Sequence, residues 1–269
     1  MPFSSVRHNN TPCWTSSTMK VHGEFVFHFV VAAYAVWLQV RIVLLMMQMH
    51  EDGLQFYSFT ACYTIEYASM WPQVLQQVYV FSSLWVDIVK AFPGRFPYSR
   101  KAASAVRNFL FPACVVPINT IVLVLFWSLY LSAPHMIEDR GIMERYLESW
   151  MNHCLHTNII IISLMEIIIC APKFPSRRRA FVTIVGMVLL YSITANSCHM
   201  LGGPWAYPIV KIMFSNWMSF IVFQAICISI GFSGYIVAER INNLVHGEQR
   251  KIMNASNGYH QDCIKNHLQ

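Results

Sequence analysis

Charge is scarce in this sequence of 269 residues. Asp, Glu, Lys and Arg together make up only 12%, against 55% hydrophobic residues, and the mean hydropathy is +0.42. A soluble domain of this length carries about twice that share of charged residues. The composition therefore argues against an ordinary soluble enzyme and indicates a membrane protein.

Several signatures of enzymes that use metals, cofactors or a soluble hydrolase fold are also missing. The eight cysteines include no Cys-x-x-Cys pair, a spacing typical of zinc and redox sites. The Gly-x-Ser-x-Gly motif of soluble serine hydrolases is absent, and so are the histidine arrays of membrane di-iron enzymes. We therefore expect neither a metal nor a cofactor.

Long apolar runs are what the sequence has in quantity. Runs of roughly 20 residues are enough to cross a bilayer core about 30 Å thick. We predict an all-α polytopic membrane protein with about six transmembrane helices, in a domain at 25–245 between polar tails at 1–24 and 246–269. The predicted helices are at 25–47, 67–89, 109–131, 151–170, 181–201 and 217–238.

The loops predict the orientation, because cytoplasmic loops collect Lys and Arg. The loops around 90–107 and 173–179 are basic, whereas those around 51–66 and 138–148 are mainly acidic. We therefore expect both termini in the cytosol. The formal charge of +6 then reflects topology and attraction to anionic lipid head groups, and we expect no binding to nucleic acid.

Two histidines, His153 and His156, stand at the start of the fourth apolar run. Residues three apart share a helix face, but a zinc or iron site needs further ligands, and no second motif of this spacing lies in the runs. A histidine near a membrane interface can also simply bond to a carbonyl. Because polar groups within membranes are candidates for function, packing and catalysis both stay open.

A search for a hydroxyl nucleophile gives two candidates. Ser233, in a Gly-x-Ser-Gly motif typical of intramembrane proteases, is expected about 16 residues, or roughly 24 Å, below the outer surface, too deep to meet His156. We interpret Gly231 and Gly234 as sites of close helix packing. Ser69 begins the second run and has the same expected depth as His156, whose neutral imidazole would accept the hydroxyl proton.

Other ionisable groups within the runs are few. We identify Arg41 and Glu166, and expect both to pair or to reach toward the interface. No inverted repeat or pair of half-helices is visible, which argues against a transporter.

Four segments in the second half of the chain carry a family resemblance. With Phe126-Trp127 and the interval from Gln76 to Asp87, they make residues 60–245 similar to the family of androgen-induced proteins and androgen-dependent tissue factor pathway inhibitor regulators. The segments are Trp150-Met-Asn-His-Cys-Leu-His-Thr157, Phe174-Pro-Ser-Arg177, Gly203-Pro-Trp-Ala-Tyr-Pro208 and Glu239-Arg-Ile-Asn-Asn243.

The resemblance implies a multi-pass membrane hydrolase of fatty acid esters of hydroxy fatty acids, with a threonine nucleophile and a histidine. The histidine falls on His156. The threonine position falls on Ser69, which keeps the hydroxyl, and Thr64 is the fallback nucleophile. A basic residue of the family is replaced here by Glu66, and its Arg-Asp pair by Arg107-Asn108.

These observations predict that Ser69 attacks a lipid ester drawn from the bilayer, with His156 as base. Asn152, His153 and Glu66 are candidates for supporting that pair, Asn152 as an oxyanion donor and Glu66 as an acid near His156 or a helix cap. The alternative is a non-catalytic membrane regulator or scaffold of the same fold. The sequence predicts no oligomeric state. It contains no retention or lipidation motif, so the endoplasmic reticulum and the plasma membrane both fit.

Overall fold

The computed structural model describes residues 15–53, 67–90, 92, 96–137, 145–203 and 205–267, with side chains between residues 22 and 248. This part of the chain is helical and contains no strand, which confirms the all-α prediction. The helices are α1 (Thr15–Glu51), α3 (Met70–Lys90), α4 (Pro97–Leu110), η2 (Phe111–Val115), α5 (Val116–Ser132), η3 (Pro134–Met136), α7 (Ser149–His156), α8 (Asn158–Cys170), α9 (Arg177–Met200), α10 (Pro208–Met213) and α11 (Trp217–His267).

Several of these helices are long and apolar enough to cross a membrane. Among the described residues four qualify, within α1, α4 to α5, α9 and α11, and the bent pair α7 and α8 makes a fifth if it counts as one span. Helix α3, expected as the second span, is not among them, because three glutamines and Asp87 lower its hydropathy. The chain is therefore a multi-pass membrane protein, and the count of six spans stays a prediction.

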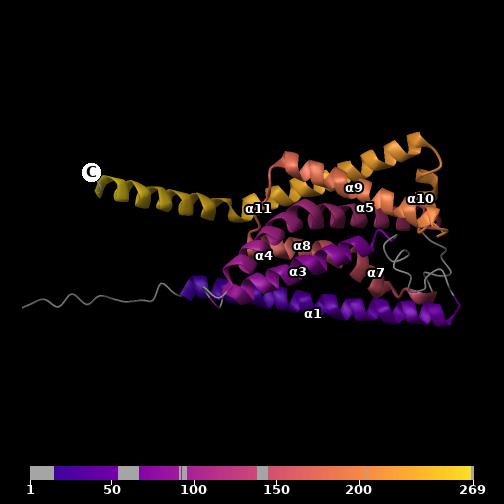
Figure 1. The fold of residues 1–269 in the computed structure, drawn as a ribbon, viewed down its shortest axis with the longest axis horizontal. Coiled ribbons are helices and arrows are strands. Elements are labelled where there is room, and N and C mark those ends of the chain that lie inside the picture. The colour runs from indigo at the N-terminus through magenta and orange to yellow at the C-terminus, as the bar shows by residue number, and fades with distance from the viewer. Residues whose placement is uncertain are drawn as a thin grey trace, which may run out of the picture.

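The helices lie side by side in an elongated bundle (Figure 1). Helix α5 runs through its middle and contacts α11, α8, α7 and α3. The amino end of α1 and the carboxy end of α11 lie at the same end of the bundle (Figure 1). This arrangement agrees with two termini on one side of the membrane, and the cytosolic assignment stays a prediction.

Helix α9 illustrates how the sequence separates core from surface. Its buried residues Ala180, Ile184, Val188 and Ala195 recur at helical spacing and face the bundle. The opposite face exposes Val182 and other large apolar side chains. Apolar residues on the outside of a helical bundle suit contact with lipid, where only backbone groups bonded within a helix are stable.

Close contact between α5 and α11 depends on glycine. A Cβ atom added at Gly234 would lie 2.3 Å from Oγ1 of Thr120, and one at Gly231 would lie 2.9 Å from Cδ1 of Ile121. A larger residue at Gly234 would overlap Thr120, whereas one at Gly231 would require the end of the Ile121 side chain to move. The prediction that these glycines serve helix packing is confirmed.

A short π-helical turn, η2, joins α4 to α5 in one continuous 36-residue helix. Pro112 and Pro117 fall in and just after this turn. Because proline has no N–H, the regular hydrogen-bond ladder is interrupted there. Further along α5, the Asn119 amide donates to the Ile159 carbonyl (3.0 Å) and to Ser163 Oγ (2.9 Å), which fixes α5 against α8.

Candidate active site

Ser69 lies in the turn that precedes α3. Its side chain is 7% exposed, although it stands at the end of a helix. Pro72 in the first turn of α3 needs no hydrogen bond to its nitrogen there. Ser69 thus lies just before the first turn of α3 and is almost entirely buried.

His156 is the last residue of α7 and is 5% exposed. Its Nδ1 lies 3.0 Å from the carbonyl oxygen of Asn152. A carbonyl can only accept a hydrogen bond, so Nδ1 carries the proton and Nε2 of the neutral ring keeps its lone pair. His156 therefore has the tautomer that a general base requires.

The ring of His156 is held in place by an aromatic side chain. It stacks on Phe126 of α5, with ring centroids 3.5 Å apart and ring planes 3° from parallel. Directly after it, the chain bends by 43° between α7 and α8. Thr157 at the bend accepts a hydrogen bond from Nε1 of Trp127 (3.1 Å), so the Phe126-Trp127 pair fixes both the ring and the bend.

Two cavities meet at Ser69 and His156. The α9/α11 cavity lies between α5, α9, α10 and α11 and contains about 880 Å³ of empty space, part of it open to the outside. The α1/α7 cavity lies between α1, α7 and the turn before α3 and contains about 800 Å³ of empty space, part of it also open to the outside. Both walls contain Ser69, Phe126, Ile137, His156 and Tyr207.

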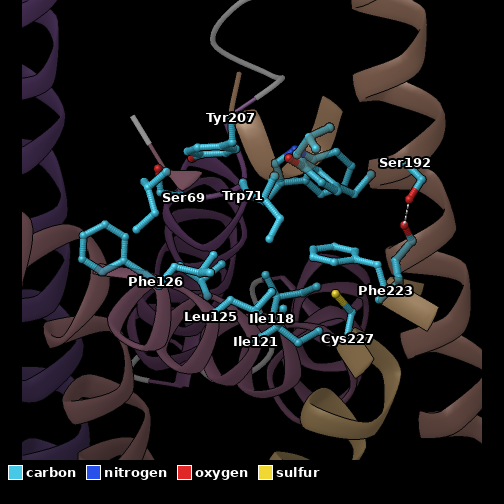
Figure 2. A pocket seen from close by; sticks show the side chains of 18 of the residues that line it. Ser69, Trp71, Ile118, Ile121, Leu125, Phe126, Ser192, Tyr207, Phe223 and Cys227 are labelled. Atoms are coloured by element: carbon cyan, nitrogen blue, oxygen red, sulfur yellow. Dashed lines mark hydrogen bonds between the residues drawn. The ribbon is translucent and has the colours of Figure 1, made fainter. Parts of the chain in front are cut away.

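Figure 2 shows the α9/α11 cavity from close by, with Ser69 and Phe126 on one side and Ser192, Phe223 and Cys227 on the opposite side. Aliphatic and aromatic side chains make up most of the wall. An interior of this kind excludes water and accommodates hydrocarbon.

Ser69 and His156 share these walls without being hydrogen bonded to each other. Within the described part of the chain, neither the Ser69 hydroxyl nor His156 Nε2 has a hydrogen-bond partner. Hydrogen bonds between catalytic groups often form only when substrate is bound. Both atoms are therefore free to bind a ligand at the junction of the cavities.

The other residues predicted for the site have separate outcomes. Asn152 lines neither cavity, and it contributes through its main-chain oxygen, while its side-chain oxygen is buried without a partner. His153 is exposed, lies against Trp127 and hydrogen bonds to Thr157 (3.1 Å). Glu66 and Thr64 lie outside the described residues. The structure thus brings together Ser69 and His156, but not His153.

A second buried histidine, His28, was missed by the sequence reasoning. It is 0% exposed, and its nitrogens contact Asp87 Oδ2 (2.5 Å) and Glu166 Oε2 (3.1 Å). Tyr79 also donates to Glu166, so the pairing expected for Glu166 is confirmed. Its location inside an apolar run was the signal that could have identified His28.

This cluster also contains the atoms that come nearest to a metal site. Nε2 of His28, an oxygen of Glu166 and Sγ of Cys170 lie within 4.8 Å of one another, the one such group among the described residues. Both nitrogens of His28 already contact carboxylates. A bound ion would have to displace the contact with Glu166, so we interpret the cluster as a network of charges. Arg41, in turn, lies over the ring of Trp150, 5.5 Å from its centroid.

Comparison with known proteins identifies the family. The family model described as FAR-17a/AIG1-like protein matches residues 23–243. The chain belongs to this family. The androgen-dependent TFPI-regulating protein of Mesocricetus auratus is 26% identical over 218 residues, which cover 81% of this chain and 90% of that protein. The human androgen-dependent TFPI-regulating protein is 24% identical over 187 residues, which cover 69% of this chain and 79% of that protein.

A human relative of a second name, androgen-induced gene 1 protein, is 23% identical over 152 residues, which cover 56% of this chain and 63% of that protein. No solved structure matches the chain. These comparisons confirm the resemblance inferred from the four sequence segments.

The four segments that carry the family resemblance come together in the fold as two pairs. Arg177 pairs with Glu239 at 2.8 Å, which joins the segment before α9 to the late segment of α11. The segment before α10 supplies Tyr207 to both cavities, and the segment in α7 supplies His156. Two of the four segments therefore build the candidate site, and the other two fasten α9 to α11.

Proposed function

We propose that this protein is an integral-membrane hydrolase of lipid esters, with Ser69 as nucleophile and His156 as general base. The observation that carries the proposal is the convergence of two apolar cavities on this pair. The free lone pair of His156 Nε2 supports it, since a base must be unprotonated before it accepts a proton. The substrate class that agrees with the family resemblance is fatty acid esters of hydroxy fatty acids.

The reaction follows from these two groups. Ser69 Oγ attacks the carbonyl carbon of the ester while His156 Nε2 accepts the hydroxyl proton. The tetrahedral intermediate collapses, the ester C–O bond breaks, and His156 returns the proton to the departing alcohol. Water then attacks the acyl-enzyme with His156 again as base, which releases the fatty acid and regenerates Ser69.

A substrate within the bilayer fits this location. The outer faces of the helices are apolar, so lipids surround the bundle. An ester that entered the cavities from the side would replace lipid contacts with apolar wall contacts and would not need to cross water. We propose the endoplasmic reticulum or the plasma membrane as the location.

The test is fluorophosphonate labelling of membranes that contain the wild-type chain or the Ser69→Ala variant, with hydrolysis of a palmitic acid ester of hydroxystearic acid measured in the same samples. We expect labelling and hydrolysis by the wild type and loss of both in the variant at equal expression. Labelling that survives in Ser69→Ala would transfer the nucleophile to Thr64 or to another hydroxyl.

The alternative is a non-catalytic membrane regulator that binds lipid in the same cavities. The observation in its favour is that the described residues provide no hydrogen bond between Ser69 and His156 and no acid that orients the imidazole. A regulator of this kind would show neither labelling nor turnover in the wild type. The same experiment therefore separates the two functions.

A further inference from the structure

The α1/α7 cavity extends along α7. Met151 and Leu155, four residues apart on one face of that helix, line its wall, and so does Tyr146 just before the helix begins. His156, at the end of the helix, lines the same wall. The eight residues of α7 rise by about 10 Å. A chain whose ester lies at the candidate nucleophile and base therefore has about 10 Å of apolar wall to follow in this direction.

Neither cavity offers a partner to a charged group. No Lys, Arg, Asp or Glu is among the described residues of the two walls. In the α9/α11 cavity, the polar side chains of Ser192 and Gln224 hydrogen bond to each other at 2.8 Å. An ionised carboxylate inside either cavity would be buried without an opposite charge, which is strongly unfavourable. A substrate with a free carboxylate must therefore place this group beyond the apolar walls.

A cation stands at the end of the α1/α7 cavity that is farther from His156. The guanidinium carbon of Arg145 lies 5.3 Å from the ring centroid of Tyr146, which lines that end. Its nitrogen lies 3.7 Å from Asp52 Oδ2, too far for a hydrogen bond, and that oxygen already accepts one from the Tyr146 hydroxyl (2.6 Å). Among the described residues, the N–H groups of Arg145 therefore have no hydrogen-bond acceptor.

This cation is accessible. The Arg145 side chain is 69% exposed. Asp52 directly follows α1, whose carboxy end lies at the end of the bundle opposite the two chain termini (Figure 1). A carboxylate that pairs with Arg145 keeps part of its hydration there, so it avoids the full desolvation cost of a buried ion pair. An extended alkyl chain, with single bonds of about 1.5 Å, advances about 1.3 Å per carbon. About eight carbons thus cover the length of α7.

We propose that Arg145 binds the free carboxylate of the hydroxy fatty acid arm at the exposed end of the α1/α7 cavity, and so selects esters whose carboxylate lies about eight carbons from the ester. The acyl chain on the other side of the ester then occupies the α9/α11 cavity. This proposal rests on the proposed function for the position of the ester. It adds the residue that recognises the carboxylate and the place of the ester along the hydroxy acid.

The first experiment compares hydrolysis of 9-palmitoyloxystearic acid with that of its carboxamide, which has nearly the same shape and no charge. We expect the wild type to prefer the acid. In Arg145→Gln, the ratio of kcat/KM for the acid to that for the amide should fall about two- to fivefold, mainly through KM, as for one exposed ion pair. Arg145→Lys should keep part of the preference. Lys211→Gln is the matched control, because Lys211 is also an exposed cation but lines neither cavity, and it should leave the ratio unchanged.

Two further changes test the geometry. Asp52→Asn removes the acid that competes for Arg145, so the preference for the acid should rise. Moving the ester to carbon 5 shortens the arm to about 5 Å, too short to reach Arg145, so for this isomer the wild type and Arg145→Gln should have the same ratio of acid to amide. A lower preference in Asp52→Asn, or an equal effect of Arg145→Gln on both isomers, would contradict the proposal.

A binding experiment makes the proposal independent of turnover. The ether 9-hexadecyloxystearic acid and its carboxamide, which cannot be hydrolysed at the ether bond, are titrated against the Ser69→Ala chain in a nonionic detergent. We expect the acid to bind about two- to fivefold tighter, and the difference to shrink as the salt concentration rises and to vanish when Arg145→Gln is added. Equal binding of acid and amide would overturn the proposal, whereas tighter binding of the acid without hydrolysis in the wild type would overturn the proposed function alone.

Discussion

Two of the buried histidines, His28 and His156, occupy opposite kinds of surroundings. His28 contacts a carboxylate at each ring nitrogen, so both nitrogens already have partners. His156 contacts one main-chain carbonyl and one aromatic ring, and the residue lines both cavities. The difference teaches that burial alone does not identify a catalytic histidine. What matters is whether a nitrogen is left to react.

Charge separates the two regions further. Around His28, Lys90 contacts Asp87 (2.7 Å) and Glu24 (3.2 Å), and Arg107 lies 3.7 Å from Asp87. Such a network holds α1, α3, α4 and α8 together by opposite charges. The region of His156 is lined mainly by neutral side chains. One end of the bundle is thus held together by opposite charges, whereas the cavities near His156 have mainly neutral walls.

The largest effect is expected from removing the histidine that has a free nitrogen. His156→Ala should lower the rate of ester hydrolysis by about a hundredfold to ten-thousandfold, the usual contribution of a general base. Turnover of a palmitic acid ester of hydroxystearic acid measures it.

His199→Ala is the matched control for that variant. His199 also stacks on an aromatic ring, Trp205 (4.0 Å), and donates from Nδ1 to a carbonyl, that of Gly203 (2.9 Å). It lines neither cavity, so its replacement should leave hydrolysis unchanged. An equal loss in both variants would show that stacking, and not proton transfer, is what the assay detects.

The next effect concerns stability at the other end of the bundle. His28→Leu should lower the free energy of unfolding by about 3–5 kcal/mol, because two buried carboxylates lose their shared partner. Unfolding by a denaturing detergent gives the value. In the double variant His28→Leu/Glu166→Gln the second substitution should cost less than it does alone, since the residues interact directly. Fully additive costs would contradict the network.

A smaller loss is expected between the two regions, where α5 meets α11. Gly234→Ala should cost about 1–3 kcal/mol, because the new Cβ overlaps Thr120. Gly186→Ala is the control, since a Cβ there meets no atom within 4 Å, and it should be neutral or stabilising. A Gly234→Ala chain as stable as the wild type would mean that α5 and α11 separate without penalty.

The smallest effect is expected at Ser69, the proposed nucleophile. Ser69→Thr keeps the hydroxyl and adds one methyl group, as in the threonine that the family resemblance implies. Hydrolysis should stay within about tenfold of the wild type, because the hydroxyl is kept and one methyl group, at the low end of its usual range, is worth about 1 kcal/mol. Comparing Ser69→Thr with Ser69→Ala in one assay distinguishes loss of the hydroxyl from a change of shape.

The sequence predicted the fold class and the positions of most helices, because a long apolar run is a local property. It did not predict α4, whose residues Pro97–Leu110 include three basic side chains and form no apolar run. The bend at Thr157 was also not predicted. At the bend, Thr157 accepts a hydrogen bond from Trp127, a residue of another helix that the sequence pattern around Thr157 does not reveal.

The site was predictable in part for the same reason. Depth in the membrane follows from position along a run, so Ser69 and His156 could be assigned to one layer. Which helices are neighbours does not follow from periodicity, and the contribution of Gln224 to the opposite wall was therefore not foreseen. His28 and Glu166 give a second example, because they are 138 residues apart. The sequence around each residue indicates which face of its helix is buried, but not which residue that face contacts.

The stacking of His156 on Phe126 has a consequence for the entropy of the reaction. An imidazole that rotates freely loses conformational freedom whenever it aligns with a hydroxyl, and this loss adds to the activation barrier. Nearly parallel rings at 3.5 Å, together with the hydrogen bond to Asn152, remove that freedom during folding. The folded chain has thus already ordered the proposed base before a substrate binds.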